Sequence, residues 1–143
     1  MNVPLILSDT DTTVGFLSQD AAKLDRAKRR PADKPYITVY PSFAAFSGAG
    51  RVPRSRRRLV RRSRRRSFIL PNGRSFRIVF DPRHLLLLRR MGWAYSSSAN
   101  LSGRPYDEAY ARSVADIVVE PLGSPKAPST ILALGKRRVR KIR

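Results

Sequence analysis

The stretch YSSSANLSG, residues 95–103, follows the apolar pair Trp93 and Ala94 and consists mostly of small hydrogen-bonding side chains. Such side chains fill a core poorly, and each one needs a hydrogen-bond partner when it is buried. Ligands of α/β sheets bind where strands end and loops gather. A buried strand that ends in this stretch therefore indicates a polar binding site at the edge of a sheet.

Segments typical of strands and helices alternate along the rest of the chain. Asp20 is expected to cap a helix that Pro31 stops, and Asp81 followed by Pro82 is a favourable start for a second helix that Gly92 closes. The turn PNG, residues 71–73, predicts a hairpin between its flanking strands. We expect strands at 4–8, 36–40, 67–70, 75–80, 93–97, 116–120, 129–134 and 138–143, and helices at 20–30, 42–46, 82–91 and 106–114. This alternation predicts a single α/β domain with a mixed sheet.

Two further polar clusters lie beside predicted strands. SDTDTTVG, residues 8–15, is interpreted as a hydroxyl-rich turn that ends at Gly15, and KRRPADKP covers residues 28–35. Taken singly, the three clusters are explained by a turn, a solvated helix end and a polar loop. Their content and order along the chain favour a shared site.

The motifs in this order resemble the YrdC/YciO family, the threonylcarbamoyl-AMP synthases. They are TDTTVGF (10–16), KRRPADKP (28–35), SFRIV (75–79), YSSSANLSG (95–103) and PSTIL (128–132). The resemblance implies a YrdC-like domain over residues 1–143, with a twisted sheet, flanking helices and a concave, positively charged groove.

The resemblance also implies the residues of the site. Lys28 and Arg30 would be catalytic cations at an exposed helix end, aimed at one triphosphate or carboxylate. Residues implied to bind the nucleotide or the amino acid are Thr10, Thr12, Lys34, Arg77, Ser97, Ser98, Asn100, Ser129 and Arg143.

The implied reaction joins L-threonine, bicarbonate and ATP into threonylcarbamoyl-AMP and releases pyrophosphate. A partner enzyme would use this product to modify an adenosine of tRNA. Mg²⁺ would arrive with ATP, since the sequence holds no carboxylate cluster that predicts a dedicated metal site. His84 is interpreted as a structural helix residue rather than a general base.

Positive charge is concentrated in two segments. The chain holds 30 Lys and Arg against 10 Asp and Glu, and 16 of the 30 lie in the basic insert 51–66 and the basic C-terminal strand 136–143. Arginine clusters of this kind favour polyphosphates such as RNA, although a solvated loop is the alternative. The residues predicted to bind RNA, on a surface distinct from the nucleotide site, are Arg56, Arg57, Arg58, Arg64, Arg65 and Arg66.

Three function classes stay open at this point. A noncatalytic module that binds double-stranded RNA or tRNA is the alternative to the synthase, and a ribosome-associated basic protein is a weaker one. Ser98 and Asn100 favour the enzyme, because RNA binding needs positive charge but not this pair. The chain has no cysteine, which excludes disulfides, and no membrane-spanning segment is expected, so a cytoplasmic location is predicted.

Overall fold

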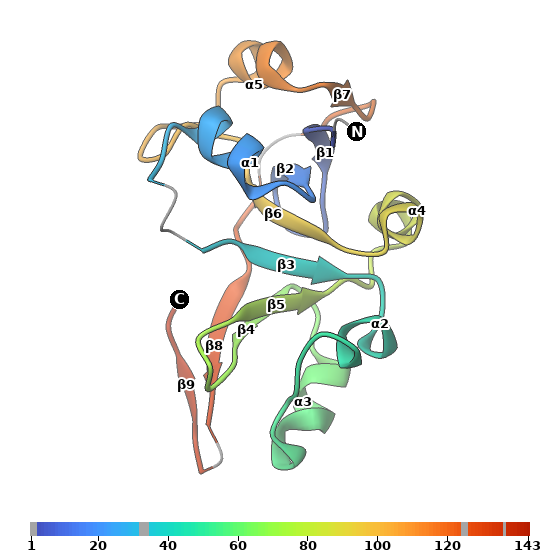
Figure 1. The fold of residues 1–143 in the computed structure, drawn as a ribbon, viewed down its shortest axis with the longest axis vertical. Coiled ribbons are helices and arrows are strands. Elements are labelled where there is room, and N and C mark those ends of the chain that lie inside the picture. Colours follow the sequence, from blue (N-terminus) through green and yellow to red (C-terminus); the bar gives the residue numbers. More distant parts are fainter. Residues whose placement is uncertain (1–2, 32–34, 124–125, 136) are drawn as a thin grey trace.

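The nine strands of the described chain form one mixed sheet in the order β7-β1-β2-β6-β3-β5-β4-β8-β9. The computed structural model describes residues 3–31, 35–123, 126–135 and 137–143 (Figure 1). Three neighbouring pairs, β1–β7, β3–β5 and β4–β8, are parallel, and the other five are antiparallel. The predicted fold class, an α/β domain with a mixed sheet, is confirmed.

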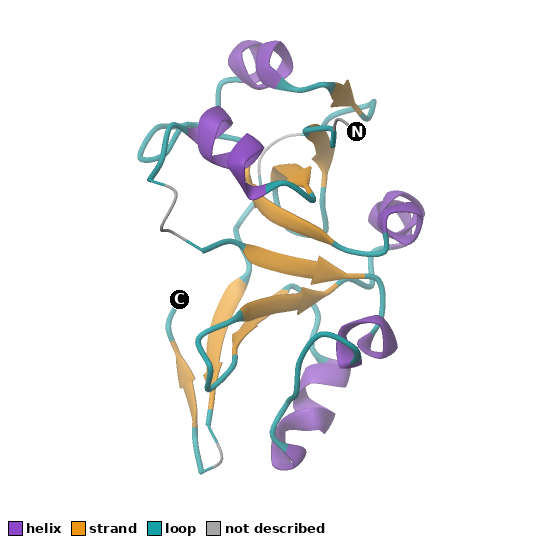
Figure 2. Cartoon of the chain, viewed as in Figure 1, coloured by secondary structure: helices purple, strands orange, loops and turns teal. Residues whose placement is uncertain are grey.

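The strands are β1 (Ile6–Asp9), β2 (Val14–Ser18), β3 (Ile37–Tyr40), β4 (Arg66–Ile69), β5 (Ser75–Ile78), β6 (Ala94–Ser98), β7 (Ile117–Val118), β8 (Thr130–Leu134) and β9 (Val139–Lys141). The helices are α1 (Ala21–Lys28), α2 (Phe43–Ser47), α3 (Arg57–Arg62), α4 (Pro82–Met91) and α5 (Glu108–Val114), with a 3₁₀ turn at Arg54–Arg56. Figure 2 shows how these helices lie around the twisted sheet.

Side-chain caps set the ends of the two longest helices as predicted. Asp20 accepts a hydrogen bond from the Ala22 amide at the start of α1, and Asp81 accepts one from the His84 amide at the start of α4. Gly92, with a φ of 84°, closes α4 and donates its amide to the Leu88 carbonyl. The hairpin around residues 71–73 is also confirmed, because β4 and β5 pair antiparallel.

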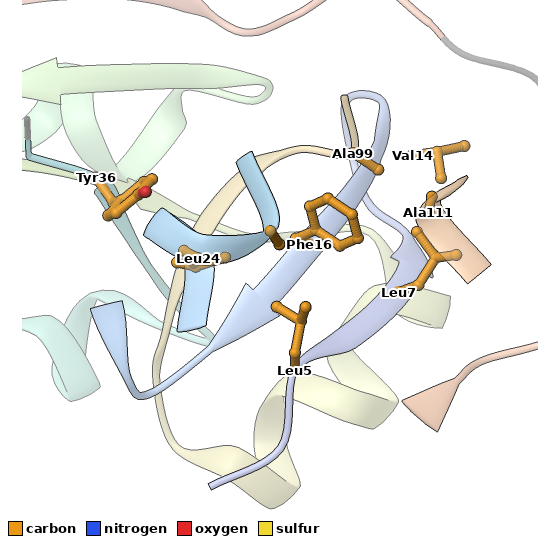
Figure 3. Close-up of a cluster of buried hydrophobic side chains, with 9 residues drawn as sticks. Leu5, Leu7, Val14, Phe16, Leu24, Tyr36, Ala99 and Ala111 are labelled. Carbon is orange, nitrogen blue, oxygen red and sulfur yellow. The ribbon is translucent and has the colours of Figure 1, made fainter. Parts of the chain in front are cut away.

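The core has one cluster at each end of the sheet and a third that packs against α4. Near β1 and β2, Leu24 of α1 is fully buried together with Leu7 and Phe16 (Figure 3). At the other end, Val60 of α3 packs with aromatic residues of α2, β4 and β5. Because Val60 anchors α3, this part of the arginine-rich insert is a packed helix and not the solvated loop that was the alternative.

The predicted turn that ends at Gly15 is wrong at both ends, because β1 extends to Asp9 and the last two residues of the turn belong to β2. β2 begins at Val14 and places Gly15 against Ser98 of β6. A Cβ at Gly15 would lie 2.9 Å from the Ser97 carbonyl oxygen, so the glycine is required for close strand packing. The turn is limited to residues 10–13.

None of the helices in the described residue ranges is long and apolar enough to cross a membrane.

Candidate functional site

A cavity of about 150 Å³ brings together side chains from five separate segments of the chain. Around it lie the first motif, the start of β3, the middle of β5, the end of β6 and both ends of the β8–β9 hairpin. The residues predicted from the sequence that line this cavity are Thr10, Thr12, Arg77, Ser97, Ser98, Ser129 and Arg143.

Hydroxyl groups on one side of the cavity are fixed by a tight turn. Thr10 Oγ1 donates to the Thr13 carbonyl at 2.6 Å and accepts from the Thr12 amide at 3.2 Å. Thr10 Oγ1 and Thr12 Oγ1 lie 3.3 Å apart, so the two hydroxyls are adjacent. Both residues are buried, and the turn holds their oxygen atoms without help from a ligand.

Arg77 reaches the cavity from β5 and is held by a buried ion pair. Its Nε donates to Asp11 Oδ2 at 3.1 Å, and the two side chains are only 4% and 5% exposed. Arg77 Nη1 donates to Ser67 Oγ at 3.2 Å, and Ser67 Oγ lies 2.7 Å from Ser129 Oγ. One connected network thus fixes a guanidinium and a hydroxyl group that both line the cavity.

Arg143 supplies a second guanidinium from the end of the chain. Its Nε and Nη2 both donate to the Ser129 carbonyl, at 3.1 and 3.0 Å. This contact aligns one edge of the guanidinium with β8. Two arginines and several hydroxyl groups around a small cavity are the donor set that suits phosphate or carboxylate oxygens.

Lys28 is not the exposed helix-end cation that the sequence predicted. The residue is 4% exposed, and its ammonium group donates to the carbonyl oxygens of Ser98 and Asn100 at 2.9 and 2.8 Å. A longer contact of 3.4 Å reaches Asn100 Oδ1, which also accepts from Ser98 Oγ. Lys28 therefore orders the loop after β6, because three acceptors of one short segment surround its ammonium group.

The side chain of Arg30 is oriented by Tyr36, the residue that follows the second motif. Its guanidinium lies 4.2 Å from the centre of the Tyr36 ring, and Nη2 donates to the Pro35 carbonyl at 2.8 Å. Tyr36 in turn lines the cavity. Arg30 thus contacts the cavity wall through Tyr36 without lining the cavity itself, and its positive charge acts on Lys28. Lys34 lies outside the described residues.

The pKa of Lys28 gives a stability prediction with a definite sign. Burial first, and then the positive charge of Arg30, lower the pKa of Lys28 from 10.5 to about 8. Between pH 8 and pH 10.5 the unfolded chain therefore binds more protons than the folded chain. Because of this difference, Lys28 makes the free energy of unfolding rise with pH. We expect this rise, measured by urea unfolding from pH 7.5 to 10, to be absent in Lys28→Arg. Parallel curves for the two proteins would contradict the assignment.

His84 lies behind the Arg77–Asp11 pair and not in the cavity. It is 2% exposed on α4, and both ring nitrogens and Asp11 Oδ1 are buried without a hydrogen-bond partner among the described residues. Burial is the main cause that lowers the pKa of His84, against the opposing charge of Asp11. A neutral imidazole next to the ion pair is consistent with the predicted structural position on α4.

Several residues of the site were missed in the sequence, and three of them contact predicted site residues. Asp11 lies between the two predicted threonines of the first motif, so its motif position was the available signal. Ser67 and Tyr36 carried no signal, because their contacts with Ser129 and Arg30 depend on strand pairing and loop geometry.

The arginines predicted to bind RNA fall into different environments. Arg56 Nε donates to the Gly135 carbonyl and Arg57 Nε to the Val52 carbonyl, so both contact backbone. Arg58 and Arg66 are exposed. Arg64 and Arg65 line a cavity of about 230 Å³ together with Asp11. This cavity shares no lining residue with the one of about 150 Å³, and the expected separation of the arginine run from the nucleotide site stays a prediction.

The sequence matches no protein-family model. It is 27% identical over 140 residues to an uncharacterized MG259 homolog from Mycoplasma pneumoniae. The match covers 91% of this chain and 30% of that relative, so the chain spans about a third of the relative's length.

The fold matches solved structures over nearly the whole chain. P. abyssi Sua5 complexed with L-threonine has a TM-score of 0.78 at 20% identity, over 98% of this chain and 50% of Sua5. E. coli YciO has a TM-score of 0.78 at 16% identity, over 99% of this chain and 82% of YciO. The chain therefore has the YrdC/Sua5 fold, as the motifs predicted, and spans about half the length of Sua5.

Proposed function

We propose that this chain is a YrdC-family domain that makes threonylcarbamoyl-AMP from L-threonine, bicarbonate and ATP. The observation that carries the proposal is the cavity that seven of the predicted site residues line from segments far apart in sequence. The likeness to Sua5, which was solved in complex with L-threonine, supports threonine as the amino acid.

The chemistry requires alignment and charge neutralisation rather than a covalent enzyme intermediate. The threonine amino group attacks bicarbonate, and loss of water gives N-carboxythreonine. The new carboxylate then attacks the α-phosphorus of ATP, the bond to the β-phosphate oxygen breaks, and pyrophosphate leaves. Negative charge that develops on the phosphates would be met by preorganised cations and hydroxyl groups.

The residues of the cavity divide between these tasks. Arg77 and Arg143 would bind phosphate oxygens, because each guanidinium is already oriented by a fixed partner. Thr10 and Thr12 would bind the threonine side. Lys28 would hold Ser98 and Asn100 in place for the nucleotide. Mg²⁺ would enter as part of the ATP substrate, because the described residues contain no cluster of three potential metal ligands.

The test of this proposal is pyrophosphate release from ATP. Release is expected only when threonine and bicarbonate are both present, and omission of either should return the rate to background. Equal release without threonine would mean that the chain is a different ATP hydrolase and would contradict the proposed reaction.

A second candidate function is the binding of double-stranded RNA or tRNA without catalysis. It is favoured by the net charge of +20 and by the exposed arginines on α3 and at the start of β4. Because α3 is a packed helix, it would present these arginines as a fixed surface.

Replacement of exposed arginines tests this candidate. Arg58→Ser, Arg62→Ser and Arg66→Ser together are expected to lower the slope of log affinity against log salt for an RNA duplex by about 2 to 3 units, since each phosphate contact contributes about 0.9. RNA titrations at several salt concentrations measure this slope. The matched control removes the equally exposed Arg89, Arg90 and Arg104. Equal losses in both triple variants would show that charge alone, and not the insert, binds the duplex.

A further inference from the structure

A second cavity, of about 600 Å³, lies over the middle of the sheet. Thr38 of β3 pairs with Tyr95 of β6 and with Phe76 of β5, so these three residues share one face of the sheet and line this cavity. Ile37 and Arg77, which line the smaller cavity, belong to the opposite face. Tyr36 is the residue that lines both.

Aromatic rings from α2, β3, β5 and β6 contribute to the wall of this second cavity. The residues around it include the chain's single tryptophan, three of its five tyrosines and two of its six phenylalanines. Phe46 stacks on Phe76 with ring centres 3.9 Å apart, and Tyr40 and Phe46 meet edge to face with ring centres 5.4 Å apart. Trp93 and Tyr95 make a second edge contact at 5.1 Å on the opposite wall. Flat heterocycles fit such walls, because they stack on the ring faces and edges.

The charge around the aromatic cavity selects among flat ligands. None of the described residues that line it is acidic, and Arg74, an exposed residue, is its charged member. The Tyr40 hydroxyl adds a hydrogen-bond donor, since burial raises the pKa of Tyr40 and keeps it protonated, whereas the Tyr36 hydroxyl already donates to Asp25 Oδ1. A ligand that combines an aromatic heterocycle with negative charge matches this set.

We propose that the aromatic cavity binds an unpaired base of a single-stranded RNA segment, whose neighbouring phosphate contacts Arg74. Double-stranded RNA cannot enter, because its bases are stacked inside the helix. This site lies on the opposite face of the sheet from the proposed synthase site, with Tyr36 as a shared wall residue, and the proposal does not rest on the synthase reaction. Base stacking on aromatic side chains is tolerant of sequence, so little base preference is expected.

Trp93 provides a direct reporter, because it is the only tryptophan of the chain and it lines the cavity. Titration with a single-stranded RNA hexamer should quench its fluorescence to saturation. The same sequence as a duplex, and inorganic polyphosphate of equal charge, should bind without this quenching. Equal quenching by duplex or polyphosphate, or none by the hexamer, would overturn the proposal.

Variants that keep apolar volume separate stacking from folding. Tyr40→Leu is expected to weaken hexamer binding at least about 5-fold, the lower bound for loss of one stacked ring. The matched control is Tyr106→Leu, a half-buried tyrosine outside this cavity, and circular dichroism checks the fold of both. Arg74→Ser should lower the salt slope by about 0.7 unit, the value for one phosphate contact of a single strand. Lys141→Ser, on the edge strand β9, should not change the quenching. Equal losses in Tyr40→Leu and Tyr106→Leu would overturn the proposal. It would also be overturned if sedimentation detects a dimer of this chain that stays intact when the hexamer is added.

Discussion

Asp11→Ala is expected to lower the free energy of unfolding by about 3 to 5 kcal/mol, the usual cost of leaving a buried charge without its partner. Asp11 and Arg77 are almost completely buried, and Asp11 Oδ2 is the carboxylate partner of the Arg77 guanidinium. The substitution would leave a positive charge between Ser67 and His84, where burial already disfavours charge. Urea unfolding at neutral pH measures the loss.

The double variant Asp11→Ala with Arg77→Met separates the effect of charge from the effect of packing. Because it removes both charges, it should recover most of the stability lost by Asp11→Ala, although it would also remove a cation from the cavity. A double variant that is as unstable as the single one would show that packing around Asp11, and not the ion pair, explains the loss.

Lys28→Ala and Arg30→Ala are each expected to slow pyrophosphate release about 100-fold, which corresponds to about 3 kcal/mol of transition-state stabilisation. The two variants should differ in stability. Lys28→Ala leaves the Ser98 and Asn100 carbonyls without their buried donor, whereas Arg30→Ala removes a ring contact and one bond to the Pro35 carbonyl.

The matched control for these two variants is Arg29→Ala, which lies between them on an exposed position at the end of α1. Its rate should be close to that of the unchanged protein. If Lys28→Ala and Arg30→Ala retain full pyrophosphate release, neither residue belongs to the catalytic site.

Local signals in the sequence predicted most of the elements. Asp20, Asp81 and Gly92 define helix ends through contacts within four residues, and the turn at residues 71–73 joins two neighbouring strands. Such features depend on short-range chemistry that a sequence displays directly. The order of the motifs predicted the fold. Residues such as Arg77 and Ser129 indicate a site only when they occur together with the other motif residues.

Long-range packing explains what the sequence did not predict. β2 was not predicted because the hydroxyl-rich residues directly before it are typical of a turn, while its pairing with β6 depends on Gly15 and a distant segment. The burial of Lys28 follows from the loop after β6 folding over it, about 70 residues away in sequence. The aromatic cavity is formed by residues from separate strands and helices, so no single stretch of the sequence predicts it.

The most direct test of the central claim is the incorporation of labelled bicarbonate into a nucleotide product. Incubation of the chain with ATP, threonine and ¹⁴C-bicarbonate should give a labelled species with the mass of threonylcarbamoyl-AMP, and Arg77→Met should abolish it. ATP binding with no labelled product, under conditions in which an active synthase gives one, would contradict the proposed synthase and leave a nucleotide- or RNA-binding domain on the same fold.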